Sequence, residues 1–170
     1  PRLFEVHLCC GRGGMQDDRA RELARAGGVH VRFISHLIRR IHPWADWMGF
    51  LELLSAFRSI RPDVVHTHSS KAGVLGRCAA AACRLLTGRP HAIVHTVHGF
   101  GFHPGQPFVV RRLFEAVEWL CARFTDRLVF VSHANRECAF AKGIARPGRD
   151  VLIRAGLSTA ALIGAGARRA

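Results

Sequence analysis

The chain has 170 residues, of which 49% are apolar and 22% are charged. This composition is that of a globular protein and excludes a disordered chain. The formal net charge is +13, and only two of the 25 basic side chains, Lys71 and Lys142, are lysines. Such a charge predicts attraction to polyanions and to anionic membranes. No stretch of about 18 consecutive apolar residues is present, so the sequence predicts no membrane-spanning helix.

Short runs rich in β-branched residues alternate with longer amphipathic stretches along the chain. Helices are predicted at about 17–26, 44–60, 72–86, 107–123 and 133–142. Strands are predicted at 3–8, 29–34, 63–66, 92–97, 128–131 and 151–153. Runs such as Val64-Val65 and 128–131 are nearly all apolar, which indicates burial on both faces. The pattern therefore predicts a doubly wound α/β domain, a Rossmann-like parallel sheet with helices on both faces.

The stretch 107–123 has the clearest helical pattern. Pro107 suits its first turn, and its apolar residues recur at i, i+3, i+4 and i+7. These residues are Val110, Leu113, Phe114, Val117, Leu120, Cys121 and Phe124. We expect this apolar stripe to face the core. The opposite, solvent-facing side would carry Arg111, Arg112, Glu115 and Glu118.

Two segments that lead into predicted strands are similar to each other. The first runs Arg61-Pro62-Asp63-Val64-Val65-His66-Thr67, and the second runs Arg89-Pro90-His91-Ala92-Ile93-Val94-His95-Thr96. Each places a histidine near the carboxyl end of its strand. The helix between them begins with small residues, which predicts that it packs close to the sheet.

Polar residues and glycines follow the predicted strands, at the edge where open α/β sheets bind ligands. Ser69-Ser70-Lys71 opens a helix, where N–H groups, hydroxyls and a cation could together bind an anion. The alternative is a simple helix cap followed by a solvated lysine. His98 precedes Gly99-Phe100, in a loop whose glycines allow close approach of the backbone to a ligand. A histidine there could accept a proton or contact a sugar or a phosphate.

Other kinds of site find less support in the sequence. His66 and His68 could bind a metal, but no third ligand at metal-site spacing is evident, so capped strand-end histidines are the preferred interpretation. The patterns of a P-loop and of a hydrolase nucleophile elbow are both missing. The six cysteines include no C-x-x-C pair. We expect them to be reduced and structural.

Four motifs, taken together, resemble one enzyme family. They are Arg61-Pro62-Asp63-Val64-Val65-His66-Thr67-His68-Ser69-Ser70-Lys71-Ala72-Gly73, His95-Thr96-Val97-His98-Gly99-Phe100, Val129-Phe130-Val131-Ser132 and Ile153-Arg154-Ala155-Gly156. In this order and spacing they are similar to the N-terminal, acceptor-side domain of a family-4 glycosyltransferase. The subgroup it resembles builds bacterial exopolysaccharide, capsule and lipid-linked glycans. The resemblance covers roughly residues 3–158.

The resemblance implies one half of a GT-B fold, in which two Rossmann-like domains face each other across a cleft. Residues 1–158 would be the N-terminal domain, incomplete at its N-terminus and lacking its first strand. Residues 159–170 would be a Gly/Ala/Arg tail. No two glutamates stand eight positions apart, as they do in the family's C-terminal donor domain, so that domain would be absent. We therefore expect the chain alone to be inactive.

For the complete enzyme, the resemblance implies transfer of a sugar from a nucleotide-sugar donor to a glycan or lipid-linked acceptor, with retention of configuration. It assigns the catalytic role to His98. It assigns substrate binding to Ser69, Ser70, Lys71, Gly99 and Phe100. It implies no metal and no other cofactor. The implied location is the cytoplasm, on the periphery of the anionic inner membrane, with no nucleic acid as partner.

Two other classes of function remain open. A GT-B-fold nucleotide-sugar epimerase would act on the same donors but would need no acceptor. A non-enzymatic basic module for nucleic acid or membrane would fit the net charge. The sequence contains no nucleic-acid-binding motif and no basic helix with interleaved aromatic residues, which disfavours the nucleic-acid form of that module.

Overall fold

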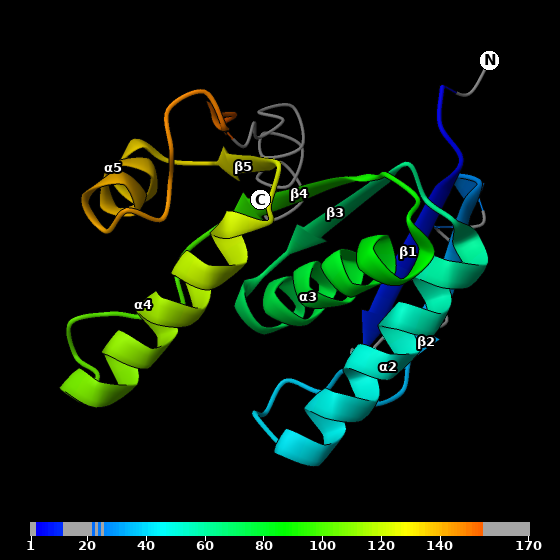
Figure 1. Ribbon diagram of the computed structural model, residues 1–170, viewed down its shortest axis with the longest axis horizontal. Coiled ribbons are helices and arrows are strands. Elements are labelled where there is room, and N and C mark those ends of the chain that lie inside the picture. The colour runs from blue at the N-terminus through cyan, green and yellow to red at the C-terminus, as the bar shows by residue number, and fades with distance from the viewer. Residues whose placement is uncertain (1–2, 12–21, 23, 25, 155–170) are drawn as a thin grey trace, which may run out of the picture.

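The computed structural model describes residues 3–11, 22, 24 and 26–154 (Figure 1). Within this part of the chain the strands form two parallel sheets. In the first sheet β1 (Val6–Gly11) pairs with β2 (Val29–Ile34). The second sheet has four strands, in the order β3 (Val64–His68), β4 (Ala92–Val97), β5 (Arg127–Phe130) and β6 (Asp150–Leu152).

Helices alternate with these strands, and the predicted parallel α/β fold is confirmed. They are α2 (Pro43–Ile60), α3 (Ser70–Thr87), α4 (Phe108–Arg123) and α5 (His133–Ala141). α2 packs along α3, and α3 packs on β3 and β4 (Figure 1). None of the described helices is long and apolar enough to cross a membrane. The predicted helix at 17–26 lies largely outside the described residues, and so does the predicted tail at 159–170.

Local signals in the sequence set the ends of α2. His42 caps the helix, because its Nδ1 accepts a hydrogen bond from the backbone N–H of Ala45 at 3.2 Å. Pro43 occupies the first turn of the helix. A backbone N–H has no acceptor within the helix at this position, so its absence in proline breaks no hydrogen bond. The helix ends at Arg61, which adopts a left-handed conformation with φ 54°. α3 ends in the same way at Gly88, a residue for which this conformation is unstrained.

One core spans both sheets. Ile34 of β2, Leu53 and Phe57 of α2, Val65 of β3 and Ile93 of β4 belong to a single buried cluster. A second cluster lies between α4, α5 and the carboxyl half of the four-stranded sheet. It contains Val97, Phe102, Ala122, Leu128, Phe130, Ala139, Ile144 and Ala145. The two-stranded sheet is thus attached to the rest of the molecule through α2.

A cavity of about 690 Å³ lies between the two sheets. Residues of β1 line one side of it, and residues 64–68 of β3 line the other. Each of these strands stands at the end of its own sheet in the described part of the chain. The expectation that a strand is missing from this fold stays a prediction, and these two free edges are where such a strand would pair.

Small residues let α3 approach the sheet closely, as predicted. A Cβ atom added at Gly73 would lie 2.5 Å from Cε1 of His95. One added at Gly76 would lie 2.8 Å from Cγ2 of Thr67. Both distances are shorter than van der Waals contact, so a larger side chain at either position would require α3 or the facing side chain of the sheet to move.

The orientation of α4 agrees with the prediction only in part, since Cys121 is buried and Phe114 packs on the second cluster, but other residues of the apolar stripe are exposed. Leu113 and Leu120 are 61% and 58% exposed, whereas Glu115 and Glu118 are buried. The reason is electrostatic. Glu118 Oε2 accepts a hydrogen bond of 2.8 Å from Nη2 of the fully buried Arg77, and Glu115 accepts one of 2.5 Å from Nζ of Lys142. Carboxylates therefore turn inward towards cations on neighbouring segments, and part of the apolar stripe turns outward.

The prediction that Val64 and Val65 are both buried is wrong for Val64. Val65 and Thr67 are buried on the face that α3 covers, whereas Val64 is 54% exposed. Successive side chains of a strand point to opposite faces, so covering one face buries only every second residue. At β3 the described helices cover one face.

Candidate functional site

Three histidines meet at the carboxyl ends of β3 and β4. His68 is the last residue of β3, and His98 directly follows β4. His68 Nδ1 and His98 Nε2 are 3.3 Å apart, within hydrogen-bonding distance. His66 lies on the same face of β3, with its ring centroid 4.4 Å from that of His68. The His66 Nε2 atom lies 2.8 Å from the hydroxyl of Thr96, which anchors this ring to β4.

The pKa values of two of these imidazoles are lowered from their usual value, which favours the neutral form. Partial burial lowers the pKa of His66, and the neighbouring imidazoles of His68 and His98 lower it further. Partial burial and the imidazole of His98 lower the pKa of His68 in the same way. A neutral imidazole carries one N–H donor and one acceptor nitrogen. The His68–His98 contact is therefore suited to an N–H···N hydrogen bond.

The loop that carries His98 is held by hydrogen bonds at two points. Nδ2 of Asn135 donates to the backbone oxygen of His98 at 3.3 Å. Asn135 itself lies in the first turn of α5, where its N–H donates to the capping hydroxyl of Ser132. Further along the loop, Nε2 of Gln106 donates to the carbonyl of Gly101 at 2.9 Å. The polar residues after β4 and β5 thus lie at one edge, as the sequence predicts.

Gly99 and Phe100 occupy different surroundings within this loop. Gly99 is exposed, and a Cβ atom added to it would meet no other atom within 4 Å. Phe100 is half-buried and stacks on Phe102, with ring centroids 4.6 Å apart. One residue further, Gly101 lies against Ser70, since its added Cβ would be 3.4 Å from the Ser70 hydroxyl. The loop after β4 therefore touches the start of α3.

Ser69 stands at the start of α3 in a strained backbone conformation. Its φ of 61° and ψ of 164° fall in a region that is nearly restricted to glycine. Its side chain forms no capping hydrogen bond, so the interpretation of Ser69 as an ordinary cap does not hold. Strain of this kind is concentrated at functional sites, where the surrounding structure imposes it.

Lys71 is not the solvated lysine of the alternative interpretation. Its Nζ donates to the backbone oxygen of Ile38 at 2.8 Å and to that of Arg40. The same ammonium forms an ion pair with Asp46 of α2. In this structure Lys71 therefore fastens the loop after β2 to the start of α3. Its role in substrate binding stays a prediction.

Sequence reasoning set His68 aside as a capped strand-end residue. Its contact with His98, 30 positions later, depends on the register that places His68 beside Thr96. The pairing of β3 with β4 fixes this register. The one signal in the sequence was the shared parity of His66 and His68, which predicts that they point to the same face.

The metal-site alternative for His66 and His68 finds no support in the described residues. Within this part of the chain, the side chains close enough to hold an ion together are Glu5, His7 and His30. They lie at the amino ends of β1 and β2, whereas the three histidines above lie at the carboxyl ends of β3 and β4.

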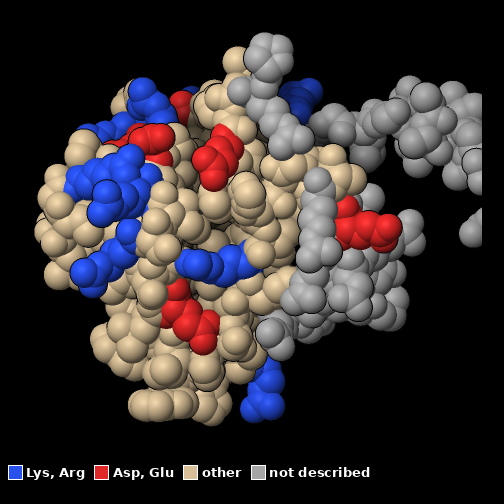
Figure 2. All heavy atoms as spheres, turned by 90° about the vertical axis from the view of Figure 1, so that its right-hand side faces the viewer, with Lys and Arg blue, Asp and Glu red and all other residues tan. Residues whose placement is uncertain are grey.

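Charged groups of both signs lie side by side on the surface. On the face shown in Figure 2, basic and acidic side chains are interspersed in a mostly uncharged surface. Ion pairs bring opposite charges together elsewhere in the described residues too, such as Arg84–Asp126 at 3.2 Å and Arg89–Asp63 at 3.1 Å. This face therefore lacks the continuous basic patch that is typical of nucleic-acid binding.

Comparison with known proteins identifies the family. Residues 1–159 match the family model of Glycosyltransferase Family 4. The chain belongs to glycosyltransferase family 4. The predicted resemblance to this family is thereby confirmed, and it places the chain among enzymes that transfer sugars.

Two curated relatives narrow the subgroup. Over 134 residues, 79% of this chain and 32% of the relative, the chain is 34% identical to the UDP-Gal:alpha-D-GlcNAc-diphosphoundecaprenol alpha-1,3-galactosyltransferase of Escherichia coli. Over 87 residues, 51% of this chain and 21% of the relative, it is 38% identical to the putative glycosyltransferase EpsD of Bacillus subtilis. The chain thus spans about a third or less of the length of these relatives.

Solved structures agree on the fold. MurG of Acinetobacter baumannii superposes with a TM-score of 0.55 at 12% identity, over 91% of this chain and 37% of MurG. A UDP-N-acetylglucosamine 2-epimerase superposes with a TM-score of 0.50 at 14% identity, over 96% of this chain and 55% of the epimerase. Both are GT-B-fold proteins, so this chain has the Rossmann-like architecture of one half of that fold.

Proposed function

We propose that the complete protein transfers a sugar from a nucleotide-sugar donor to a lipid-linked glycan acceptor, with retention of configuration, in the synthesis of cell-surface polysaccharide. Membership of family 4 supports the transfer reaction. The name of the Escherichia coli relative supports the donor and acceptor classes, because that enzyme uses a UDP-sugar and a diphosphoundecaprenol-linked sugar. This chain supplies the acceptor-side half and is inactive by itself, since the donor-binding half of the cleft is required.

The contact between His68 and His98 is the observation on which the proposed site rests. His98 is the catalytic residue and lies beside the sugar that is transferred. The substrate-binding residues around it are Ser69, Ser70, Lys71, Gly99 and Phe100. The site acts by orienting the two substrates and stabilising charge on the leaving phosphate. No metal or other cofactor takes part.

His68 acts as a positioning residue for His98. If His68 donates from Nδ1, His98 accepts at Nε2 and keeps its own proton on Nδ1. The hydrogen bond then fixes both the tautomer and the direction of the His98 ring. The second ring contact, to His66, restrains His68 in turn.

The test uses the complete enzyme of which this chain is a part. His98→Ala should lower kcat by about 10²–10³-fold, the usual cost of removing one preorganised group that stabilises transition-state charge. His103→Ala, an exposed histidine in the same loop, is the matched control and should leave kcat unchanged. Near-normal turnover by His98→Ala would remove His98 from the site. A product formed without any acceptor would instead indicate an epimerase.

The positioning role of His68 is tested separately by ¹⁵N NMR of the chain. His68→Ala should change the tautomer distribution of His98, whereas His68→Asn, whose amide N–H can replace the Nδ1 donor, should largely restore it. An unchanged His98 spectrum in His68→Ala would contradict the positioning role without touching the assignment of His98 as catalytic.

We further propose that the protein works at the cytoplasmic face of an anionic membrane and that α4 contacts this membrane. Val109, Leu113 and Leu120 form an exposed apolar stripe on α4. Arginines lie along it, and the Arg123 guanidinium stacks 3.9 Å from the centroid of the Trp119 ring. An apolar stripe with arginine and tryptophan at its side is typical of helices that lie in a membrane interface.

Vesicle binding tests this second proposal. The chain should sediment with vesicles that contain anionic lipid at low salt, and less so with zwitterionic vesicles. Leu113→Glu should weaken this binding. Leu86→Glu, at a leucine on α3 that is 66% exposed against 61% for Leu113, is the control and should bind as the unmodified chain does. Equal losses in both variants, or no binding at all, would exclude α4 as the contact.

A further inference from the structure

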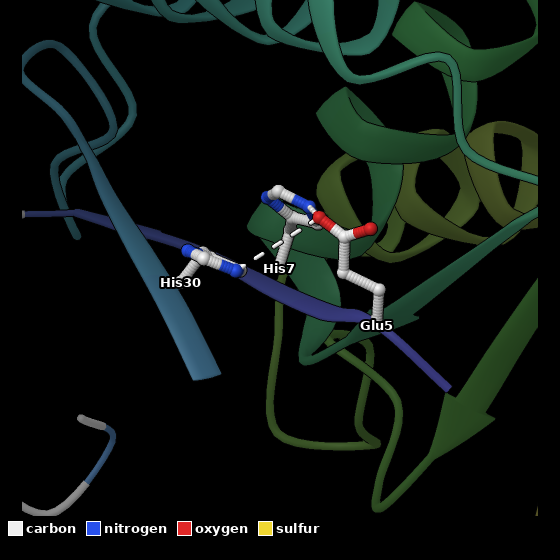
Figure 3. A group of neighbouring side chains, drawn as sticks. All are labelled: Glu5, His7 and His30. Atoms are coloured by element: carbon white, nitrogen blue, oxygen red, sulfur yellow. Dashed lines mark hydrogen bonds and ion pairs between the residues drawn. The ribbon is translucent and has the colours of Figure 1, made fainter. Parts of the chain in front are cut away.

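Three side chains converge at the amino ends of β1 and β2. His7 of β1 and His30 of β2 are register partners, so their side chains leave neighbouring strands at the same level. Their rings stack with centroids 4.8 Å apart and an interplanar angle of 23°. Glu5 stands two residues before His7, and Figure 3 shows its carboxylate turned towards both imidazoles.

The polar atoms of these residues are close enough to share one ion. Glu5 Oε1 lies 2.9 Å from His7 Nε2 and 3.9 Å from His30 Nε2. One ligand atom from each residue lies within 4.8 Å of the other two. All three residues are exposed, so a small rotation of the side chains can draw the atoms around a common centre. The parallel pairing of β1 with β2 keeps the backbones at the required spacing.

We propose that Glu5, His7 and His30 bind a divalent transition-metal ion that links β1 to β2. Two imidazole nitrogens and one carboxylate oxygen form a donor set that suits Zn²⁺, Co²⁺ or Ni²⁺. Mg²⁺ and Ca²⁺ prefer oxygen ligands alone, so this donor set selects against them. Three protein ligands leave at least one position for water.

Cys9, which shares its side of β1 with Glu5 and His7, does not complete the site. Among the described residues, the side chains close enough to share an ion are those of Glu5, His7 and His30, and Cys9 is not among them. Its register partner, Arg32, places a cation at this level of the sheet, which also disfavours a metal ion there. The ion therefore binds at the strand ends, with nitrogen and oxygen ligands.

This site is distinct from the sugar-transfer site, although Glu5 and His7 line the same cavity as His66 and His68. The sugar-transfer residues follow the carboxyl ends of β3 and β4, whereas Glu5, His7 and His30 stand at the amino ends of the other sheet. The bound ion links β1 to β2, because it takes ligands from both strands.

Calorimetric titration of the chain with Zn²⁺ tests the proposal. The chain should bind Zn²⁺, and an excess of Mg²⁺ should not compete. Loss of a residue that only supports a metal ligand weakens binding by about 10–100-fold. Loss of a ligand itself should cost at least as much, so His7→Ala and His30→Ala should each weaken Zn²⁺ binding by that factor or more. His103→Ala, at an exposed histidine in the loop after β4, should bind as the unmodified chain does. Absence of binding, or unchanged binding in both histidine variants, would overturn the proposal.

Two further measurements keep the test independent of folding defects. Glu5→Gln alters one exposed side chain without changing its shape, and it too should weaken Zn²⁺ binding. Bound Co²⁺ should give visible d–d absorption without a thiolate charge-transfer band, and acidification to pH 5 should release it because bound imidazoles must be neutral. A thiolate band would assign the ion to cysteine and contradict the proposed site.

Discussion

The two sheets of this chain contain the same kind of parallel strand but are stabilised differently. β4 pairs with a strand on each edge, and its Ile93 is fully buried under α3. In the described part of the chain β1 pairs on one edge only, and its Val6 is 46% exposed. The burial of an apolar strand therefore depends on the strands and helices that pack against it, and not on its own composition.

The polar side-chain contacts of the two regions differ in the same way. Arg77 and Glu118 join α3 to α4 beside the four-stranded sheet, and both are buried. His36 and Glu52 join the loop after β2 to α2, and both are partly exposed. Water screens the contact between His36 and Glu52 but not the pair of Arg77 and Glu118, so the two contacts contribute differently to stability.

The largest expected effect concerns these two contacts. Glu118→Ala leaves the Arg77 cation buried without its partner and should lower the free energy of unfolding by about 3–5 kcal/mol. Glu52→Ala, in the other region, should lower it by about 1 kcal/mol or less. Urea denaturation of each variant measures both. Equal losses would mean that burial does not distinguish the two pairs.

The strands themselves provide the second test. Ile93→Ala removes fully buried atoms from β4 and should lower the free energy of unfolding by about 2–5 kcal/mol. Val6→Ala removes two carbon atoms that are half exposed. At about 0.8 kcal/mol for each fully buried CH₂ group, it should cost about 1 kcal/mol or less. A cost for Val6→Ala as large as that for Ile93→Ala would show that β1 is as buried as β4.

A pH titration addresses the four-stranded sheet alone. Burial, followed by the nearby Arg77 cation, lowers the pKa of His95 to about 3. The unfolded chain therefore binds a proton at His95 below pH 6.5 that the folded chain does not bind, and stability falls as the pH falls from 6.5 towards 3. The loss at pH 5 should be about 2 kcal/mol. His95→Asn should remove this part of the pH dependence of urea denaturation, and an unchanged slope would contradict it.

The smallest effect concerns the strained start of α3. Ser69→Gly should raise the free energy of unfolding by about 1 kcal/mol, because glycine adopts the φ of 61° without the cost that serine bears. Arg61→Gly, at the positive φ that ends α2, is the matched comparison and should give a smaller gain. Thermal denaturation of the two variants measures the difference. Destabilisation by Ser69→Gly would mean that the serine side chain contributes more than the strain costs.

Much of the fold follows from the sequence by itself. The predicted strands at 29–34 and 92–97 coincide with β2 and β4, and the other strand ends differ by one to three residues. These strands can be predicted because the signals that start and end them, β-branched runs, glycines and prolines, lie within a few residues of one another. The edge that carries the candidate site also follows, since polar residues and glycines directly succeed the strands.

The prediction for α4 was wrong for Glu115, Glu118 and the exposed leucines, because helical periodicity identifies two faces but does not say how much of each is covered. The sequence of α4 offers an apolar stripe and a carboxylate stripe. Arg77 and Lys142, which draw the carboxylates inward, lie on segments remote in sequence. The choice between the faces was therefore made by cations that tertiary structure brings to the helix.

The two similar segments that contain the starts of β3 and β4 also separate what the sequence determines from what the tertiary structure decides. The sequence by itself determined that each segment forms a strand with a histidine near its end. One extra residue in the second segment reverses the parity, so that His66 is exposed and His95 is buried. Only the tertiary structure decided that His68 meets His98, because strand pairing joins residues that are distant along the chain.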